Sequence, residues 1–106
     1  MIKGNTINNG SAGIYWSGTG ATILSYDHVI DSNTVNNSFQ YGIYVGFNGR
    51  LTASRNIVNI TMPRNATNYG IYSTSSDSAF QYTANKVNID GITVATTYGI
   101  YFTGCD

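Results

Sequence analysis

The chain has 106 residues, a formal net charge of +0, and only 9% charged residues. One domain is the usual content of such a length, and the balanced charge gives no electrostatic basis for binding nucleic acid. A hydrophobic content of 42% argues against disorder, and no apolar run approaches the ~20 residues of a membrane span. Abundant Asn, Thr, Ser and Gly, with a single Pro, predict an all-β fold.

The predicted elements repeat in a fixed order along the chain. A polar segment at 5–9 (NTINN) leads into a strand at 12–16 (AGIYW) and then into a segment at 23–31 (ILSYDHVID). The same order returns at 33–37 (NTVNN), 41–45 (YGIYV) and 51–59 (LTASRNIVN). It returns again at 69–73 (YGIYS) and 80–88 (FQYTANKVN), and the last strand lies at 98–102 (YGIYF).

The repeat length predicts a solenoid. The glycines of the repeated motif are Gly13, Gly42, Gly70 and Gly99, which are 29, 28 and 29 residues apart. Such a period is too short for a four-stranded propeller blade, and within a unit the apolar residues alternate with period two. The sequence therefore predicts a parallel β-helix of about four coils with a repeat of 28–29 residues, in which equivalent residues stack ~4.8 Å apart. Because a hexapeptide rhythm is absent, we expect a right-handed coil.

An ungapped alignment of the units sets the expected coils and columns. It gives a partial coil at 1–4, coils at 5–32, 33–60 and 61–89, and an incomplete coil at 90–106. The predicted interior columns are Ile14, Ile43, Ile71 and Ile100; Ile23, Leu51 and Phe80; and Ile30, Val58 and Val87. Strict alternation places Tyr41, Tyr69 and Tyr98 on the same face as the isoleucines, and Tyr15, Tyr44, Tyr72 and Tyr101 on the outer face.

The segments NTVNNSFQYGIYVG and ASRNIVNI resemble the repeats of right-handed parallel β-helix proteins of the pectate-lyase-like superfamily. The resemblance covers essentially the whole chain. It implies the fold, but the family contains polysaccharide lyases, glycoside hydrolases, phage tailspikes and bacterial surface proteins, so it does not choose among functions. In that family a lyase site combines clustered acids that hold calcium with a basic residue. The five aspartates of this chain share no register position.

Both ends of the chain are expected to fall inside a coil and to be uncapped, since neither end shows an amphipathic helix or a polar closing coil. Natural solenoids cover their ends for solubility. Two hypotheses follow: the chain is part of a longer solenoid, or its ends stack head to tail on other copies.

The lone histidine, in the segment YDHVID, is interpreted as structural. The ungapped alignment puts His28 level with Asn56 and Asn85, Asp31 level with Asn59 and Asn88, and Asp27 level with Arg55. These positions are typical of corners where Asn side chains stack, with Asn5 and Asn33 forming a separate column. We identify no catalytic residue and no metal site, and we expect no cofactor.

The outer tyrosine column is the candidate site. Cross-strand stacking that stabilises the sheet is the favoured interpretation, while stacking against sugar rings makes Tyr15, Tyr44, Tyr72 and Tyr101 candidate carbohydrate-binding residues. The sequence therefore favours a non-enzymatic, structural or adhesin-like module of a secreted or cell-surface bacterial protein, with polysaccharide as a weakly bound partner. Two alternatives stay open: a fragment of a polysaccharide lyase or glycoside hydrolase whose active site lies elsewhere, and a self-assembling head-to-tail β-solenoid.

Overall fold

The computed structural model describes residues 1–20, 25–61, 67–76, 80–90 and 96–105, which form strands, turns and bends. The described residues contain no helix that is long and apolar enough to cross a membrane. The strands are β1 (Ile2–Lys3), β2 (Thr6–Asn8), β3 (Ala12–Ser17), β4 (Ser25–Tyr26), β5 (Val29–Asp31), β6 (Thr34–Asn36), β7 (Tyr41–Gly46), β8 (Asn48–Gly49), β9 (Thr52–Ser54), β10 (Ile57–Ile60), β11 (Asn68–Thr74), β12 (Gln81–Thr83), β13 (Lys86–Ile89) and β14 (Thr97–Thr103).

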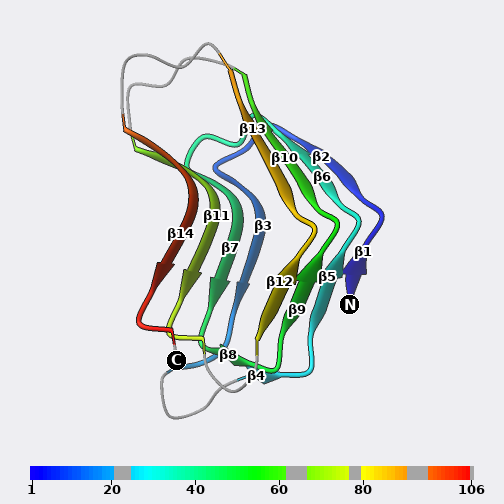
Figure 1. Ribbon diagram of the computed structural model, residues 1–106, viewed down its shortest axis with the longest axis vertical. Coiled ribbons are helices and arrows are strands. Elements are labelled where there is room, and N and C mark those ends of the chain that lie inside the picture. The colour runs from blue at the N-terminus through cyan, green and yellow to red at the C-terminus, as the bar shows by residue number, and fades with distance from the viewer. Residues whose placement is uncertain (21–24, 62–66, 77–79, 91–95, 106) are drawn as a thin grey trace.

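The strands form three walls of a parallel β-helix (Figure 1). Sheet 1 has the order β1-β5-β9-β12, sheet 2 the order β2-β6-β10-β13, and sheet 3 the order β3-β7-β11-β14. The short strands β4 and β8 pair beside them, and every pairing is parallel. The chain visits sheets 1, 2 and 3 in turn, so each strand pairs with its equivalent one coil later. The prediction of an all-β parallel β-helix of about four coils is confirmed.

The second coil is shorter than the repeat predicted from the sequence. Ile7 pairs with Val35, an offset of 28 residues, but Val35 pairs with Val58, an offset of only 23. Sheet 1 shows the same short step, since Ile30 pairs with Ala53. The predicted column of Ile30, Val58 and Val87 is therefore wrong: Ile30 belongs to sheet 1, and Val58 and Val87 belong to sheet 2.

The offset varies because coils of different length use the same corners. Within the described residues, sheet 2 follows sheet 1 through a residue with positive φ in every coil, namely Gly4, Ser32, Arg55 and Ala84. Each of these residues is followed by an asparagine. The coils therefore begin at Asn5, Asn33, Asn56 and Asn85, rather than at the expected 5, 33, 61 and 90. Differences in length fall elsewhere in the coil and leave this corner unchanged.

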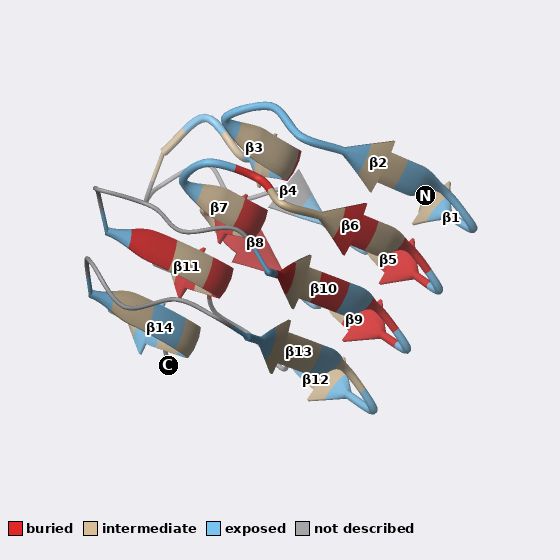
Figure 2. Cartoon of the chain, turned by 90° about the horizontal axis from the view of Figure 1, so that it is seen from above, coloured by how far each residue is buried: buried red, intermediate tan, exposed pale blue. Residues whose placement is uncertain are grey.

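The apolar core runs along the axis and is closed best in the middle coils, where buried residues concentrate (Figure 2). Its buried members are Ile14, Ile30, Val35, Ile43, Val45, Leu51, Ala53, Val58, Ile60 and Ile71. Ile14, Ile43, Ile71 and Ile100 lie in register, as predicted, although Ile100 in the last described coil is 55% exposed. Ile23 of another predicted column lies outside the described residues.

Sheets 2 and 3 lie in close contact at three glycines of the repeated motif, Gly13, Gly42 and Gly70. A Cβ atom on Gly42 would lie 2.4 Å from Val58 Cγ1 and 2.5 Å from the carbonyl oxygen of Gly70. Gly13 and Gly70 are equally crowded, with Val35 and Val87 in the place of Val58. At these three positions the motif therefore needs glycine, because the backbone lies against the valine column of the facing wall.

Candidate functional site: the tyrosine face

The glycine in the motif interrupts the alternation of sheet 3 and brings two tyrosines to the same side. Gly42 points at Val58 and Ile43 is also buried, so two consecutive residues face the interior. As a result Tyr41 lies on the outside next to Tyr44, with ring centroids 5.1 Å apart in an edge-to-face arrangement. The prediction that Tyr41 shares the inner face with Ile43 is wrong for this reason, and the same holds one and two coils later.

Seven of the nine tyrosines gather on this side of the molecule, in two columns. The predicted column is real: Tyr15, Tyr44, Tyr72 and Tyr101 stack with centroid distances of 4.3, 5.3 and 5.4 Å. A second column, missed in the sequence, consists of Tyr41, Tyr69 and Tyr98, with centroid distances of 5.3 and 5.1 Å. We call the seven residues together the tyrosine face.

The two columns also interlock. Each ring of the second column makes edge-to-face contacts with the first, such as Tyr69 with Tyr72 at 4.9 Å and with Tyr101 at 5.5 Å. Edge-to-face and offset-stacked pairs are the favoured arrangements of aromatic rings, and each adds about 0.5–1.5 kcal/mol beyond burial. The tyrosine face is therefore a fixed surface, held by contacts along and across its columns.

Stacking decides which atoms the tyrosines offer to a ligand. Rings within the predicted column are nearly parallel, with interplanar angles of 3°, 9° and 12°. Both ring faces of Tyr44 and Tyr72 are thus covered by their neighbours above and below. A ligand lying along the column meets ring edges and hydroxyl groups, and a full ring face is open only at the ends of the column.

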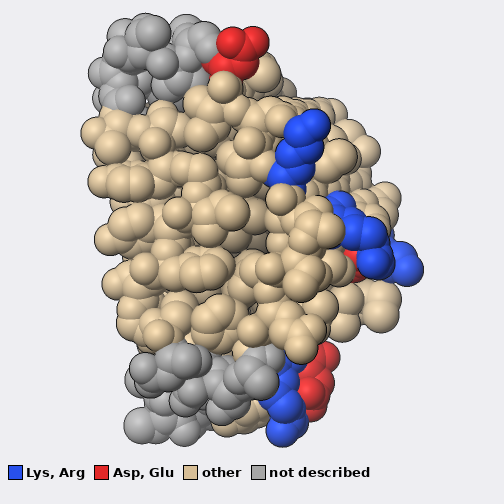
Figure 3. Space-filling model, viewed as in Figure 1, with Lys and Arg blue, Asp and Glu red and all other residues tan. Residues whose placement is uncertain are grey.

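Three hydroxyl groups of the tyrosine face, those of Tyr41, Tyr44 and Tyr69, have a raised pKa, which favours their neutral form. Burial raises the pKa of Tyr44 to about 12, and the nearby Tyr15 adds to the shift. Burial also raises the pKa of Tyr41 and of Tyr69, again with help from neighbouring tyrosines. None of the strands β3, β7, β11 and β14 carries a charged residue, and in Figure 3 the charged side chains lie away from sheet 3. The surface is therefore polar, uncharged and aromatic.

His28 takes a different position from the one expected. The N–H of Thr52 donates to the carbonyl oxygen of His28, as the N–H of Gln81 does to Leu51, so His28 stands in the column of Leu51. The expected match to Asn56 is wrong because the ungapped alignment carried a 28-residue offset across a 23-residue coil. The imidazole lies against Trp16, with centroids 4.6 Å apart. His28 is therefore a partly buried residue of the wall and does not occupy the asparagine corner.

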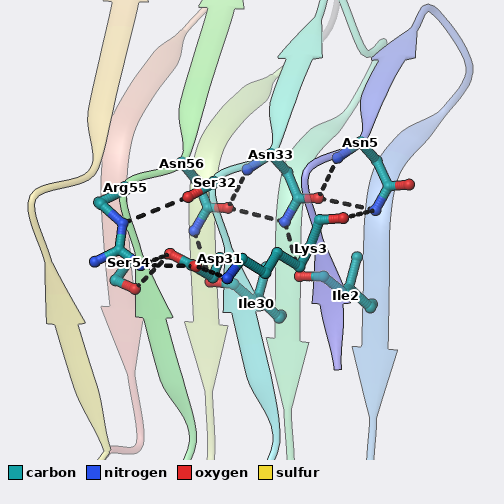
Figure 4. A network of polar contacts seen from close by, with 10 residues as sticks. All are labelled: Ile2, Lys3, Asn5, Ile30, Asp31, Ser32, Asn33, Ser54, Arg55 and Asn56. Carbon is teal, nitrogen blue, oxygen red and sulfur yellow. Dashed lines mark hydrogen bonds and ion pairs between the residues drawn. The ribbon is translucent and has the colours of Figure 1, made fainter.

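The carboxylates in the same segment pair separately with arginines. Asp27 lies level with Arg50, and the two exposed side chains form a bidentate pair at 2.9 Å; the expected match of Asp27 to Arg55 is wrong. Asp31 is buried and binds Arg55 at 2.7 Å and Lys3 at 3.6 Å, with a hydrogen bond from Ser54 (Figure 4). Burial alone would raise the pKa of Asp31, but the hydrogen bonds from Arg55, Ser54 and Ser32 outweigh it and hold the pKa below its ordinary value. Both carboxylates act in structural pairs.

The asparagines form two continuous ladders instead of separate columns. The corner ladder is Asn5, Asn33, Asn56 and Asn85, in which each amide binds the next at 2.9–3.0 Å. Figure 4 shows its first three members. The strand ladder is Asn8, Asn36, Asn59 and Asn88, with bonds of 2.7–2.8 Å. The expected match of Asp31 to Asn59 and Asn88 is wrong, since Asn36 holds that position. The amides satisfy one another inside the wall.

The described part of the chain contains no group of three or more His, Cys, Asp or Glu residues that could hold a metal ion. Asp27 and Asp31 each face an arginine, so these two carboxyl groups do not converge on a shared site. The tyrosine face repeats through all described coils.

Comparison with known proteins gives no match: no protein-family model, curated protein or solved structure corresponds to the chain.

Proposed function

We propose that the chain is a non-enzymatic β-helix module of a secreted or cell-surface bacterial protein, and that its tyrosine face makes weak contacts with polysaccharide. The observation that carries the proposal is the interlocked double column of seven tyrosines on an uncharged wall. Stacked rings make the wall stiff, and the same groups return at every coil. Several weak contacts to a repeating polymer add through multivalency.

The geometry also sets how a sugar would be recognised. Because neighbouring rings cover the faces of Tyr44 and Tyr72, the proposal assigns the contacts to hydroxyl groups and ring edges. Neutral hydroxyls donate and accept hydrogen bonds, which suits a neutral, polyhydroxylated ligand. Gln40, whose Nε2 lies 3.4 Å from the hydroxyl of Tyr41, adds an amide at one margin of the face.

Affinity electrophoresis through gels that contain neutral polysaccharides tests the proposal. We expect the chain to be retarded, and the double variant Tyr44→Phe/Tyr72→Phe to lose most of the retardation although it keeps both rings. Tyr26→Phe is the matched control, because Tyr26 is exposed but lies off the face, under the guanidinium of Arg50. If the Phe variants are retarded as strongly as the original chain, hydroxyl recognition is wrong. If no gel in a broad panel retards the chain, the tyrosine face is purely structural.

A further inference from the structure

The corner ladder has a direction, and its two ends are left with complementary groups. In each step the backbone N–H and the Nδ2 of one asparagine donate to the Oδ1 of the next, as Asn33 does to Asn56. Asn56 donates to Asn85 in the same way. Within the described residues, Asn85 therefore has no next amide to receive its N–H, while the Oδ1 of Asn5 receives no donor.

The strand ladder runs in the opposite direction. Here the Nδ2 of each asparagine donates to the Oδ1 of the previous one, as Asn36 does to Asn8 at 2.8 Å and Asn88 does to Asn59 at 2.7 Å. The last described coil thus ends with the acceptor of Asn88, and the first begins with the donor of Asn8. The first coil thus presents the acceptor of Asn5 and the donor of Asn8. The last described coil presents the complementary groups, the donors of Asn85 and the acceptor of Asn88.

In the last described coil the apolar columns end with exposed residues, and at the other end the same columns begin with apolar residues, of which Ile14 is buried. In the last described coil Ile100 is 55% exposed, Phe102 44% and Ile89 43%. The column of Ile100 begins at Ile14, and the column of Phe102 passes through Ser73 and Val45 to Trp16. Continuing the columns past the last coil would place Ile14 against Ile100 and Trp16 against Phe102.

The sheet edges impose an orientation. One end shows β12, β13 and β14, and the other shows β1, β2 and β3. All pairings within the sheets are parallel, so joining unlike ends continues every sheet in parallel register. Joining like ends would reverse the direction in which the strands of one copy circulate about the axis, so the three sheets could not all continue in parallel.

From these features we propose that the chain binds a second copy of itself head to tail, with β12, β13 and β14 of one copy pairing with β1, β2 and β3 of the next. Asn85 donates its N–H and Nδ2 to the Oδ1 of Asn5 in the next copy. That copy's Asn8 donates its Nδ2 to the Oδ1 of Asn88. The contact is heterologous and does not close on itself, so it produces linear assemblies whose length grows with concentration.

Charge does not oppose the contact. The chain has a formal net charge of +0, which favours association. In the extended register Thr6 of one copy follows the column of Thr34, Ile57 and Lys86 of the other. Lys86 therefore meets a neutral residue.

Two substitutions on the same strand, each adding one negative charge, give the decisive test. Asn8→Asp keeps the oxygen that accepts from Asn36 but replaces the Nδ2 donor with a carboxylate facing Asn88 of the other copy. We expect about tenfold weaker association. Thr6→Asp places its carboxylate opposite Lys86, and we expect association a few-fold tighter. Sedimentation velocity over a range of concentrations measures both.

The sedimentation results distinguish the proposed contact from its alternatives. The proposal expects the mass of the unsubstituted chain to rise with concentration, and the two variants to shift in opposite directions. A monomer at every concentration up to about 1 mM would overturn it. Equal shifts of the two variants would overturn the register of the contact.

A mixing experiment tests the head-to-tail orientation. Ile100→Lys blocks the end that carries β14, and Ile7→Lys blocks the end that carries β2. Ile57→Lys is the control, because Ile57 lies on the outside of β10 and pairs with Lys86, so its column already contains a lysine. We expect each blocked variant alone to be monomeric, their mixture to form dimers, and Ile57→Lys to assemble like the original chain. Dimers in either blocked variant alone would show that like ends join, which contradicts the proposal. Far-ultraviolet circular dichroism confirms that each variant is folded.

Discussion

Asn33 and Asn56 are only 23 residues apart, yet they occupy equivalent corners of consecutive coils. The backbone N–H and the Nδ2 of Asn33 both donate to the Oδ1 of Asn56 at 3.0 Å. Both side chains are fully buried. A buried amide that makes all its hydrogen bonds specifies register, because a slip by one residue would leave its donors and acceptors unsatisfied. The corner ladder therefore fixes which residues of one coil lie above which residues of the next.

The corner ladder predicts an unequal cost for two Asn→Ala substitutions. Asn56 accepts two bonds from Asn33 and donates to Ile30 and Asn85, all in the wall. We expect Asn56→Ala to lower the free energy of unfolding by about 3 kcal/mol, because buried partners lose their bonds. Asn88→Ala removes one side-chain bond, to Asn59, and should cost about 1 kcal/mol. Urea unfolding measures both; equal costs would contradict the structural role of the corner ladder.

The close approach of sheets 2 and 3 predicts that alanine substitution lowers stability strongly at one motif glycine and hardly at all at another. A Cβ on Gly42 would meet Val58 at 2.4 Å and a backbone carbonyl at 2.5 Å, so Gly42→Ala should cost about 2–3 kcal/mol. Among the described residues, a Cβ on Gly99 would meet only Ile89, at 4.0 Å. Gly99→Ala should therefore change stability by no more than about 0.5 kcal/mol.

The control for this pair is the double variant Gly42→Ala/Val58→Ala. It relieves the contact with the valine but not the contact with the carbonyl of Gly70, so stability should not recover. A tolerated Gly42→Ala would show that the two walls lie farther apart than described here.

The arginine pairs predict a graded response. Arg55 binds the buried carboxylate of Asp31, whereas Arg50 binds Asp27, and both members of the second pair are exposed. Arg55→Gln should lower the urea midpoint clearly, because among the described residues it leaves the buried carboxylate with Lys3 alone as a cationic partner. Arg50→Gln should have little effect, since exposed ion pairs contribute little. The reverse order would show that Asp31 does not need its arginine.

Alkaline pH should destabilise the fold through its tyrosines. Burial raises the pKa of Tyr82 to about 12, although its hydrogen bond to Ser73 opposes the shift. The pKa of Tyr44 is also raised to about 12. In the unfolded chain both titrate near 10.0, so the unfolded state loses its protons first. The free energy of unfolding is therefore unaffected well below pH 10 and falls as the pH rises from 10 towards 12, with about 2–3 kcal/mol from Tyr82.

Phenolate absorbance and circular dichroism, recorded together, measure this effect. We expect the last tyrosines to ionise together with unfolding, and Tyr82→Phe to reduce the loss of stability above pH 10. Ionisation of all tyrosines near pH 10 without any change in the fold would contradict the buried environments of Tyr44 and Tyr82.

The sequence predicts the architecture well because its strongest signal, the Gly-Ile-Tyr motif, lies in sheet 3. There the offsets of 28 and 29 residues hold, and the column of Ile14, Ile43 and Ile71 follows directly. In sheets 1 and 2 the ungapped repeat is wrong by five residues across the short coil, because it assumes an offset of 28 where the strands pair at 23. The signal was present, since Asn33 and Asn56 each begin the same pattern, Asn-x-Val-Asn. A gapped alignment that matched each asparagine after a corner would have found the short coil.

The second tyrosine column could not be predicted by alternation. Tyr41 is two residues before Ile43, and a regular strand would put both on one face. Only the crowding of Gly42 against Val58 shows that the backbone turns an extra residue inwards. The signal available in the sequence was the glycine itself, since glycine within a strand often marks a close backbone approach or a bulge.

The tyrosine face and the complementary ends both depend on the register of the coils, and disulfide trapping tests that register most directly. The structure pairs Val29 with Thr52, whereas the ungapped repeat would pair Val29 with Ile57. With Cys105→Ser as background, we expect Val29→Cys/Thr52→Cys to form an intramolecular disulfide on mild oxidation, since paired strands lie within disulfide reach. Val29→Cys/Ile57→Cys should stay reduced. Ready oxidation of the second pair and none of the first would contradict the short second coil, and with it the ladders described here.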